Sequence, residues 1–243
     1  MRILGIIPSR YNSSRFPGKP LANILGKSMI QRVYDQSQKC NLLNKVVVAT
    51  DDERISFHVK SFGGNVMMTS KNHKSGTDRC GEVIRKLEEY YDIVVNIQGD
   101  EPFINPNQIT QLLKMFENTN IQIASLARKI DNYETYSNIN IVKVFFDEKN
   151  IVKGFERESK LNEEDFENYN TYKHIGIYAF RTNILNEIID LNPTENEKKL
   201  NLEQLRWIEN KYSIHIGITE IDSLSVDKIE DIEKISEFHL KND

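Results

Sequence analysis

The sequence predicts an α/β fold with a mostly parallel sheet and a mixed-sheet elaboration at about residues 122–181. Two observations carry this prediction. Before residue 120, short β-branched or apolar runs alternate with stretches of helical apolar spacing, as expected for parallel βαβ units. After about residue 122, strand-like runs follow one another without full crossover helices, so a region of mixed strand direction is expected there.

Four strands, each followed by a polar turn and a helix, make up the first half of the expected fold. The helical stretches have apolar residues near i, i+3 and i+4, as Val83, Leu87 and Tyr90 illustrate. The expected strands are residues 3–7, 46–50, 66–68 and 93–97, and the expected covering helices are residues 29–39, 53–62, 77–90 and 106–117.

The second half is expected to start with the elaboration and then to return to the α/β body. Its expected strands are residues 123–127, 141–146, 174–180 and 214–219, and its helices are residues 183–191, 202–210 and 229–240. We see no internal repeat or linker, and a chain of 243 residues is within the range of a single core. A single domain over residues 1–243 is therefore expected.

The bulk composition argues against several partners. Thirty-two Lys and Arg against 36 Asp and Glu give a formal charge of -4, which offers no general attraction to nucleic acid or to an acidic membrane. Pro8 and Arg10 interrupt the first apolar run, and no stretch approaches membrane-spanning length. We therefore expect a cytoplasmic protein without membrane insertion or nucleic-acid binding. Cys40 and Cys80 lie in helical patterns and lack metal or redox spacing, so we expect reduced structural thiols.

The loop of residues 8–20, directly after the first strand, is the first candidate site. Ligands of open α/β sheets bind beyond the carboxyl ends of the strands. The loop starts with Pro8 and Ser9 and holds Arg10, Arg15 and Lys19, whose charges suit a polyphosphate. A solvated basic loop is the alternative. Both GxxxxGK[ST] and GxGxxG are missing, which argues against a P-loop ATPase and a Rossmann dehydrogenase.

Two carboxylates follow strand ends. Asp100 comes after Gln98 and Gly99 at the end of the fourth strand, and Asp227 follows the last strand. Such a pair is what a magnesium (Mg²⁺) polyphosphate site requires, although each residue alone is commonly a turn or helix cap. Between the third strand and its helix, residues 73–79 could contact a base or a phosphate through hydroxyls and backbone groups; a simple capping loop is the alternative.

These ordered motifs together resemble the 3-deoxy-manno-octulosonate cytidylyltransferases, also called CMP-KDO synthetases, over essentially the whole chain. Residues 7–21 are similar to the family's nucleotide loop and residues 48–51 to its second-strand motif. Residues 75–79 and 98–102 are similar to its cytidine and metal motifs. Residues 140–144, 174–178 and 202–206 are similar to its segments around the sugar.

The resemblance implies a nucleotidyltransferase-type, Rossmann-like fold and a homodimer formed largely through the elaboration. It also implies magnesium-dependent transfer of CMP from CTP to an acidic sugar, with release of pyrophosphate. Asp100 and Asp227 would hold the metal, and Arg10, Arg15 and Lys19 would act with them in catalysis. The implied nucleotide-binding residues are Pro8, Ser9, Arg10, Arg15, Lys19, Ser75, Gly76, Thr77, Arg79, Gln98 and Asp100, and the implied sugar-binding residues are Arg157, His174, Tyr178, Glu203 and Gln204.

The chain departs from the family pattern in two places. Where the family usually has Ser-Arg-x-x-Ile-Pro, residues 156–161 read Glu-Arg-Glu-Ser-Lys-Leu and keep only Arg157. Where it has Gly-Val-Asp-Thr-Pro-Glu-Asp, residues 225–231 keep Asp227 but change its flanks. An 8-amino-octulosonate, a sialic-acid-like acceptor, and a nucleotide-binding paralogue without catalysis therefore remain alternatives to octulosonate transfer.

Overall fold

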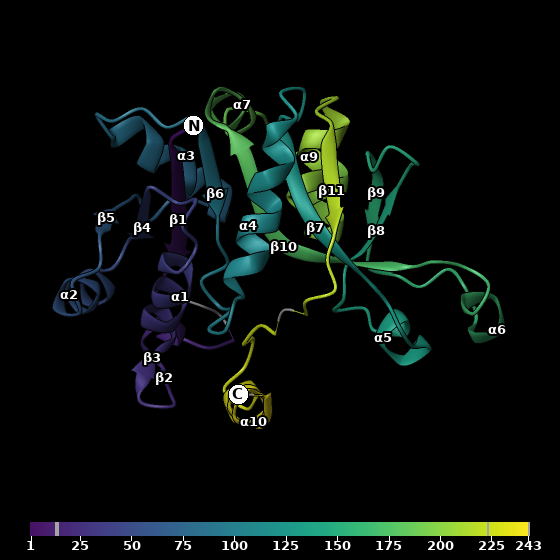
Figure 1. Cartoon of the computed structure of the whole chain (residues 1–243), viewed down its shortest axis with the longest axis horizontal. Helices are drawn as coiled ribbons and strands as arrows, with labels where there is room; N and C mark the ends of the chain where they lie inside the picture. The colour runs from purple at the N-terminus through teal and green to yellow at the C-terminus, as the bar shows by residue number, and fades with distance from the viewer. Residues whose placement is uncertain (13–14, 223, 243) are drawn as a thin grey trace. The chain divides into compact units, whose positions relative to one another are not determined.

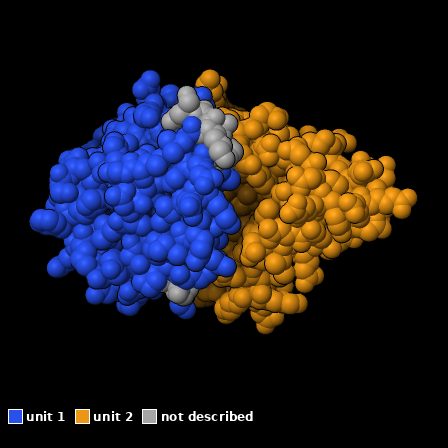
Figure 2. All heavy atoms as spheres, turned by 90° about the horizontal axis from the view of Figure 1, so that it is seen from below, with its two compact units in different colours: residues 1–110, 223–243 blue, residues 111–222 orange. Residues whose placement is uncertain are grey.

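The protein is described here by a computed structural model that covers residues 1–12, 15–222 and 224–242, without the side chains of residues 238, 241 and 242. The chain forms two compact units, Met1–Thr110 with Ser223–Asp243, and Gln111–Asp222 (Figure 2). The first unit holds every predicted nucleotide and metal residue, and the second holds every predicted sugar residue. The single domain expected over residues 1–243 stays a prediction.

The first unit is built on four parallel strands in the order β6, β1, β4, β5. These strands are Ile3–Ser9 (β1), Lys45–Thr50 (β4), Val66–Met68 (β5) and Ile93–Asn96 (β6). Leu4, Ile6 and Ile7 are fully buried, as expected of a parallel strand covered on both faces. In this unit the parallel α/β arrangement that the apolar runs predicted is confirmed.

Helices follow these strands as the spacing predicts (Figure 1). Ser28, Asp52 and Ser75 cap the first three through their side-chain oxygens. The helices are Met29–Gln38 (α1), Glu53–Ser61 (α2), Gly76–Lys86 (α3) and Pro106–Lys114 (α4). The prediction of a third helix to residue 90 was wrong. Leu87 has an extended backbone that ends α3, and Tyr90 is 67% exposed.

Short elements that periodicity did not predict complete the first unit. They are a turn of 3₁₀ helix at Lys19–Leu21 (η1) and the strands Asn23–Ile24 (β2) and Lys27–Ser28 (β3). The C-terminal helix Asp231–Asn242 (α10) packs through Ile235 against a buried cluster of Ile24, Met29 and Val226. This contact ties the C-terminal segment to the region just after the nucleotide loop.

The second unit contains a sheet of mixed strand direction, as predicted. Strand β10 is antiparallel to β7 and β8, β8 is antiparallel to β9, and β11 is parallel to β7. The strands are Ile123–Lys129 (β7), Lys143–Phe146 (β8), Val152–Glu156 (β9), Tyr172–Arg181 (β10) and Ile214–Ile218 (β11).

Only short helices connect the strands of the second unit before residue 182, in agreement with the missing crossover helices. The helices of this unit are Met115–Glu117 (η2, 3₁₀), Tyr133–Ser137 (α5), Glu163–Phe166 (α6), Thr182–Ile188 (α7), Glu195–Leu200 (α8) and Gln204–Glu209 (α9). Trp207 on α9 packs edge-on against Tyr178 and Phe180 of β10, with ring centroids 5.0 and 5.3 Å apart. The core of this unit lies between that helix and the sheet.

Two further expectations concern the cysteines and the membrane. Cys40 and Cys80 are free and buried, as expected of structural cysteines, and their reduced state stays a prediction. Cys80 lies in α3, whereas Cys40 lies just beyond α1 rather than within a helix. Within the described part of the chain, no helix is both long and apolar enough to cross a membrane.

A buried ion pair in the second unit gives a test of this packing. Arg206 donates two hydrogen bonds to Glu197, and the side chains are only 6% and 12% exposed. Removing one partner leaves the other charge buried, so Arg206→Met is expected to lower the free energy of unfolding by about 3 kcal/mol. Lys27→Met removes a cation from the exposed Lys27–Asp35 pair and is expected to cost less than about 1 kcal/mol. Equal shifts of the two urea-unfolding midpoints would contradict the assigned burial.

Candidate active site

The carboxyl ends of β1 and β4 lie side by side in the first unit, because Ser9 pairs with Thr50 in the parallel register. The nucleotide loop leaves β1 at this point. Ser9 is 4% exposed, and its hydroxyl has no hydrogen-bond partner among the residues that the structure describes. A buried hydroxyl without a partner at a strand end is available to a ligand. Residues 13 and 14 of the loop lie outside the described residues.

Residues 75–79 and 98–102 each approach Pro8 at a glycine. A Cβ atom added to Gly99 would lie 2.7 Å from the carbonyl oxygen of Pro8, closer than any real contact. A Cβ atom on Gly76 would lie 3.4 Å from the ring of Pro8 and from the Asn96 side chain. The backbone of residues 98–102 therefore approaches the start of the nucleotide loop this closely only because Gly99 lacks a side chain, whereas the approach at Gly76 leaves room for an ordinary van der Waals contact.

Lys19 joins the nucleotide loop to both carboxylate segments. Its Nζ donates to Asp100 Oδ2 at 2.7 Å and to the carbonyl oxygen of Val226 at 2.8 Å. The backbone N–H of Val226 donates to the carbonyl of Asp100 at 2.9 Å. The side chains of Lys19 and Asp100 are 15% and 29% exposed, so this ion pair is partly desolvated. Residues far apart in the sequence thus meet around one ammonium group.

Asp227 pairs with a second cation of the same loop. Arg15 Nη2 lies 3.0 Å from Asp227 Oδ1, and the two side chains are 57% and 45% exposed. Asp231 Oδ2 accepts hydrogen bonds from the backbone N–H groups of Asp227 and Lys228, which fixes the backbone that carries Asp227. Four of the five predicted catalytic residues therefore form two ion pairs, Lys19–Asp100 and Arg15–Asp227. The fifth, Arg10, belongs to neither pair.

The donor chemistry of Asp100 and Asp227 fits a magnesium ion. Carboxylate oxygens are its preferred protein ligands, and Mg²⁺ is usually bound by one or two carboxylates together with substrate phosphates and water. The described residues contain no group of three or more His, Cys, Asp or Glu side chains arranged to hold a metal. Two carboxylates completed by a nucleotide therefore suit this chain better than a metal cage made of protein alone.

Arg79 is held rigidly behind the strand ends. It is 3% exposed and donates to the Thr69 hydroxyl and, at 3.1 Å, to Asp51 Oδ2. Ser75 caps α3, because its hydroxyl accepts a hydrogen bond from the N–H of Asp78. This is the contact that the capping-loop alternative predicted. The hydroxyl of Thr77 accepts from the Asn96 side chain at 3.3 Å.

Glu82 anchors the loop that leads into α3. It accepts from the backbone of Ser70 at 2.8 Å and from His73, and it pairs with Lys86 at 2.6 Å. Burial by itself raises the pKa of Glu82, but the bonds from Lys86, Ser70 and His73 outweigh it and lower the pKa to about 2. The ionised carboxylate therefore holds the approach to residues 75–79 in place. Sequence reading did not single out Glu82.

A second anchor holds the start of the nucleotide loop. The Arg54 guanidinium lies 3.3 Å from the ring centroid of Tyr11 and forms two hydrogen bonds with Asp52, which caps α2. Arg10 and Tyr11 line a small cavity of about 150 Å³ together with Asn12, Asp51, Asp52, Lys71 and His73. Arg10 is exposed, and Gln98 is partly buried.

In the second unit, His174 and Tyr178 lie near one another on β10, with ring centroids 5.2 Å apart. Burial lowers the pKa of His174 to about 3, so the ring is neutral at physiological pH, and its Nε2 lies 2.8 Å from the Ser125 hydroxyl. Burial, aided by the charge of Glu203, raises the pKa of Tyr178. The Tyr178 hydroxyl is buried and has no partner within the described ranges. Gln204 is 6% exposed at the start of α9.

Arg157 is bound to backbone rather than to a neighbouring carboxylate. Its Nε donates to the carbonyl of Leu200 at 3.0 Å, and Nη2 lies 3.4 Å from that of Asn201, at the C-terminal end of α8. Cations are favoured at such helix ends. The carboxylate of its neighbour Glu156 pairs instead with Lys160.

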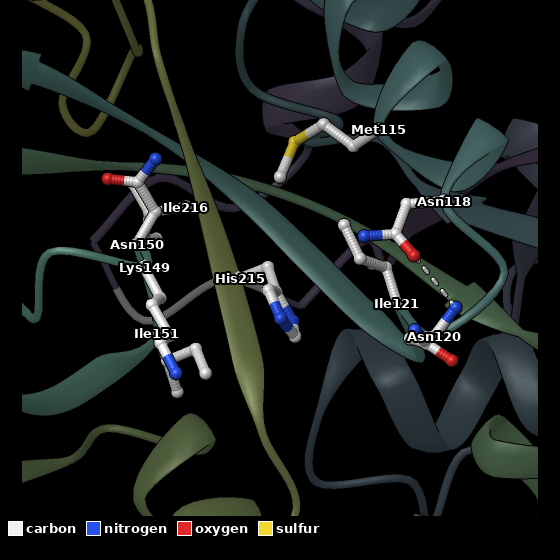
Figure 3. Close-up of a pocket in the computed structure, with 9 residues that line it drawn as sticks. All are labelled: Met115, Asn118, Asn120, Ile121, Lys149, Asn150, Ile151, His215 and Ile216. Carbon is white, nitrogen blue, oxygen red and sulfur yellow. Dashed lines mark hydrogen bonds between the residues drawn. The ribbon is translucent and has the colours of Figure 1, made fainter.

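The second unit also contains a cavity of about 350 Å³ that none of the predicted site residues lines (Figure 3). The ring of His215 lies among its lining side chains, and Nδ1 of this ring has no hydrogen-bond partner in the described part of the chain. The lining residues are Met115, Asn118, Asn120, Ile121, Lys149, Asn150, Ile151, His215 and Ile216.

The chain is similar to known proteins over most of its length. The model of the family described as Cytidylyltransferase matches residues 4–218. A 3-deoxy-manno-octulosonate cytidylyltransferase of Parabacteroides distasonis is 48% identical, with 98% of both chains covered. One of Bacteroides thetaiotaomicron is 45% identical over 100% of this chain and 99% of the relative. The chain belongs to the 3-deoxy-manno-octulosonate cytidylyltransferase family. The resemblance predicted from the motifs is thereby confirmed.

A solved structure supports the fold of this family member. It is CMP:2-keto-3-deoxy-manno-octonic acid synthetase complexed with CTP, which is 35% identical and covers 100% of both chains with a TM-score of 0.93. The predicted nucleotidyltransferase-type α/β fold is confirmed.

The segment that departs from the family pattern has structural contacts of its own. The Ser159 hydroxyl donates to the carbonyl of Tyr136 at 2.8 Å, and the Lys160 N–H donates to the Tyr136 hydroxyl at 3.1 Å. Nearby, Lys143 is 1% exposed and donates to the carbonyl oxygens of Asn138 and Arg157. Residues 156–161 are therefore fastened to α5 and β8 although their sequence has changed.

The close approach at Gly99 can be tested by adding one methyl group. Gly99→Ala is expected to push residues 98–102 away from Pro8, weakening CTP binding by roughly tenfold and lowering the free energy of unfolding by about 1–3 kcal/mol. Gly154→Ala is the matched control, because its Cβ would meet no atom within 4 Å. Calorimetric titration with CTP measures the affinities. Unchanged CTP affinity in Gly99→Ala would show that this approach does not shape the nucleotide site.

Proposed function

We propose that this chain transfers CMP from CTP to the anomeric hydroxyl of 3-deoxy-manno-octulosonate and releases pyrophosphate. The observation that carries the proposal is the meeting of two loop cations with two carboxylates, Lys19 with Asp100 and Arg15 with Asp227. It is supported by relatives of that name at 45% and 48% identity over nearly the full chain. Opposite charges on loops at strand ends are the parts that phosphoryl-transfer chemistry needs.

The proposed reaction is an in-line displacement at the α-phosphorus of CTP. The anomeric oxygen of the sugar forms a bond to that phosphorus and loses its proton, while the bond to the bridging oxygen of pyrophosphate breaks. Negative charge then accumulates on the leaving pyrophosphate. Arg10, Arg15 and Lys19 are proposed to neutralise it, and the positioning of both substrates supplies much of the rate.

Asp100 and Asp227 are proposed to hold magnesium against the phosphates. Once bound, the metal would neutralise phosphate charge and polarise the reacting phosphoryl group. The remaining nucleotide contacts are proposed to come from Pro8, Ser9 and Gln98, together with Ser75, Gly76, Thr77 and Arg79. Asp51 and Thr69 hold the Arg79 guanidinium in one orientation before the nucleotide arrives, which lowers the ordering cost of binding.

The acceptor is proposed to bind through Arg157, His174, Tyr178, Glu203 and Gln204. The Tyr178 hydroxyl, which has no hydrogen-bond partner among the described residues, and the neutral His174 ring suit sugar hydroxyls, which donate and accept hydrogen bonds. Arg157 is the candidate for the sugar carboxylate, and it would have to exchange the carbonyls of Leu200 and Asn201 for it. The altered segment 156–161 favours one second candidate, CMP transfer to a related acidic sugar such as 8-amino-octulosonate or a sialic-acid-like acceptor.

We extend the proposal to a cytoplasmic homodimer. Within residues 122–181, three large apolar side chains remain exposed: Ile139 at 59%, Phe145 at 40% and Tyr169 at 62%. A second copy packed on this elaboration would cover such residues. A reaction that consumes CTP also fits the compartment where nucleoside triphosphates are made.

A substrate panel tests the proposed reaction. Pyrophosphate release with magnesium and 3-deoxy-manno-octulosonate is expected to favour CTP over ATP by at least about a hundredfold in kcat/KM, because a purine would leave polar groups of the base site unpaired. The 8-amino sugar and a sialic acid, each tested with CTP, separate the acceptor alternatives. Equal kcat/KM values with ATP and CTP would refute the proposed selectivity of the base site. Absence of pyrophosphate release with every pair of substrates would instead favour a non-catalytic nucleotide-binding protein.

The two carboxylates give a test within the site. Asp100→Asn and Asp227→Asn are each expected to reduce kcat by on the order of a hundredfold or more, because the variant loses a charged metal ligand. The chain is expected to stay folded, because the amide oxygen can still accept a hydrogen bond from Lys19 or Arg15. Asp35→Asn removes a carboxylate that pairs with Lys27 on the surface and is the matched control. Near-normal turnover of either site variant at limiting magnesium would remove that residue from the metal site.

A further inference from the structure

The two carboxylates proposed to bind metal are each paired with a cation of the nucleotide loop. Lys19 lies 2.7 Å from Asp100, and Arg15 lies 3.0 Å from Asp227. The same two cations are the ones proposed to bind pyrophosphate. Each therefore has two alternative anionic partners, a carboxylate of the protein and a phosphate of the nucleotide.

The Lys19–Asp100 pair is the stronger obstacle to a divalent cation. Its side chains are 15% and 29% exposed, so solvent screens the ammonium group only partly. Lys19 is also fixed by the Val226 carbonyl, which keeps its charge beside Asp100. A divalent cation that approached this carboxylate would meet the repulsion of a neighbouring positive charge. It would also have to replace an existing charge-assisted hydrogen bond.

By the same reasoning, the Arg15–Asp227 pair is a weaker obstacle to a divalent cation. With side chains 57% and 45% exposed, it is screened by water and salt, and exposed pairs contribute little. Arg15 donates to both Asp227 carboxylate oxygens, at 3.0 and 3.4 Å. The two cations should therefore differ in how strongly they oppose metal binding, with Lys19 first.

A bound triphosphate would reverse this situation. Its oxygens offer Lys19 and Arg15 a denser negative charge than a carboxylate, and departure of the cations would leave Asp100 and Asp227 free to coordinate metal. We propose that Lys19 and Arg15 act as internal counter-ions that keep divalent cations off Asp100 and Asp227 until a nucleoside triphosphate draws the two side chains away. This inference rests on the proposed function of the same site.

The consequence is a coupling between the two ligands. If bound nucleotide raises the affinity of the protein for metal by some factor, bound metal raises its affinity for nucleotide by the same factor, because linkage is reciprocal. The protein alone should bind divalent cations weakly, although its two carboxylates lie on segments joined by the Val226–Asp100 backbone bond. Removing a counter-ion should strengthen metal binding even where it harms nucleotide binding, a combination that a purely catalytic role of Lys19 does not predict.

Titration of the protein with Mn²⁺ alone tests the inference. Mn²⁺ prefers the same oxygen ligands as magnesium, and the electron paramagnetic resonance signal of free Mn²⁺ reports binding without nucleotide or turnover. Lys19→Gln is expected to raise the Mn²⁺ affinity by about tenfold, within the usual range of coupling between two ligands. Arg15→Gln should raise it by roughly two- to fivefold, because its pair is exposed.

Lys27→Gln is the matched control, since it also removes a lysine from an Asp pair but lies outside the site. Its Mn²⁺ affinity should stay within about twofold of the unaltered chain, the size expected of a screened distant charge. Adding Asp100→Asn to Lys19→Gln should abolish the gain. Circular dichroism checks that each variant is folded, and the exposed Arg15→Gln provides the test if Lys19→Gln does not fold.

Unchanged or weaker Mn²⁺ binding in folded Lys19→Gln would overturn the inference, as would a gain of equal size in Lys27→Gln. If Lys19→Gln did not fold, unchanged Mn²⁺ binding in Arg15→Gln would overturn it. These outcomes are separable from failure of the proposed function. CMP transfer by the unaltered chain together with unchanged metal affinity in the variants would refute the counter-ion role alone. No transfer from any nucleotide would refute the function instead.

Discussion

The first unit depends most on two hydrogen bonds of the Lys19 ammonium group, one to Asp100 and one to the Val226 carbonyl. They join the loop after β1, the motif after β6 and the C-terminal segment that continues into α10. A partly buried cation must be paired, so these segments cannot separate without leaving charge uncompensated. The buried cluster of Ile24, Met29, Val226 and Ile235 holds the same segments from the apolar side. The predicted catalytic residues thus also contribute to the packing of the unit.

The sequence predicted the larger elements because their signals are local. The apolar runs that became β1, β4 and β6 are almost wholly buried, and the short edge strand β5, although partly exposed, begins and ends at the predicted residues. The end of α3 was missed because Leu87 and Tyr90 continue an apolar pattern after the backbone has left helical geometry. The β2–β3 hairpin was not predicted, since strands of two residues carry almost no periodicity. β9 was missed because Val152–Glu156 contains a lysine, a glycine and a glutamate in place of an apolar run.

Site residues divide in the same way. Motifs with charged residues at strand ends pointed to Lys19, Asp100, Arg15 and Asp227, and the structure pairs them, although their roles stay predictions. Contacts to backbone leave no trace in a sequence, so the carbonyls that bind Arg157 and the Val226 carbonyl that binds Lys19 could not be foreseen. Glu82, Arg54 and Tyr11 were missed because their contacts are to other protein groups, which no sequence motif marks. They hold the segments that carry the proposed ligand contacts.

We propose that Asp100 and Asp227 exchange protein cations for metal when the nucleotide binds. A crystal structure with magnesium and a CTP analogue that cannot release pyrophosphate tests it most directly. We expect oxygens of both carboxylates at about 2.0–2.1 Å from the metal, with the Lys19 and Arg15 side chains moved onto the phosphates. Intact Lys19–Asp100 and Arg15–Asp227 pairs, with the metal bound by phosphates alone, would contradict the claim.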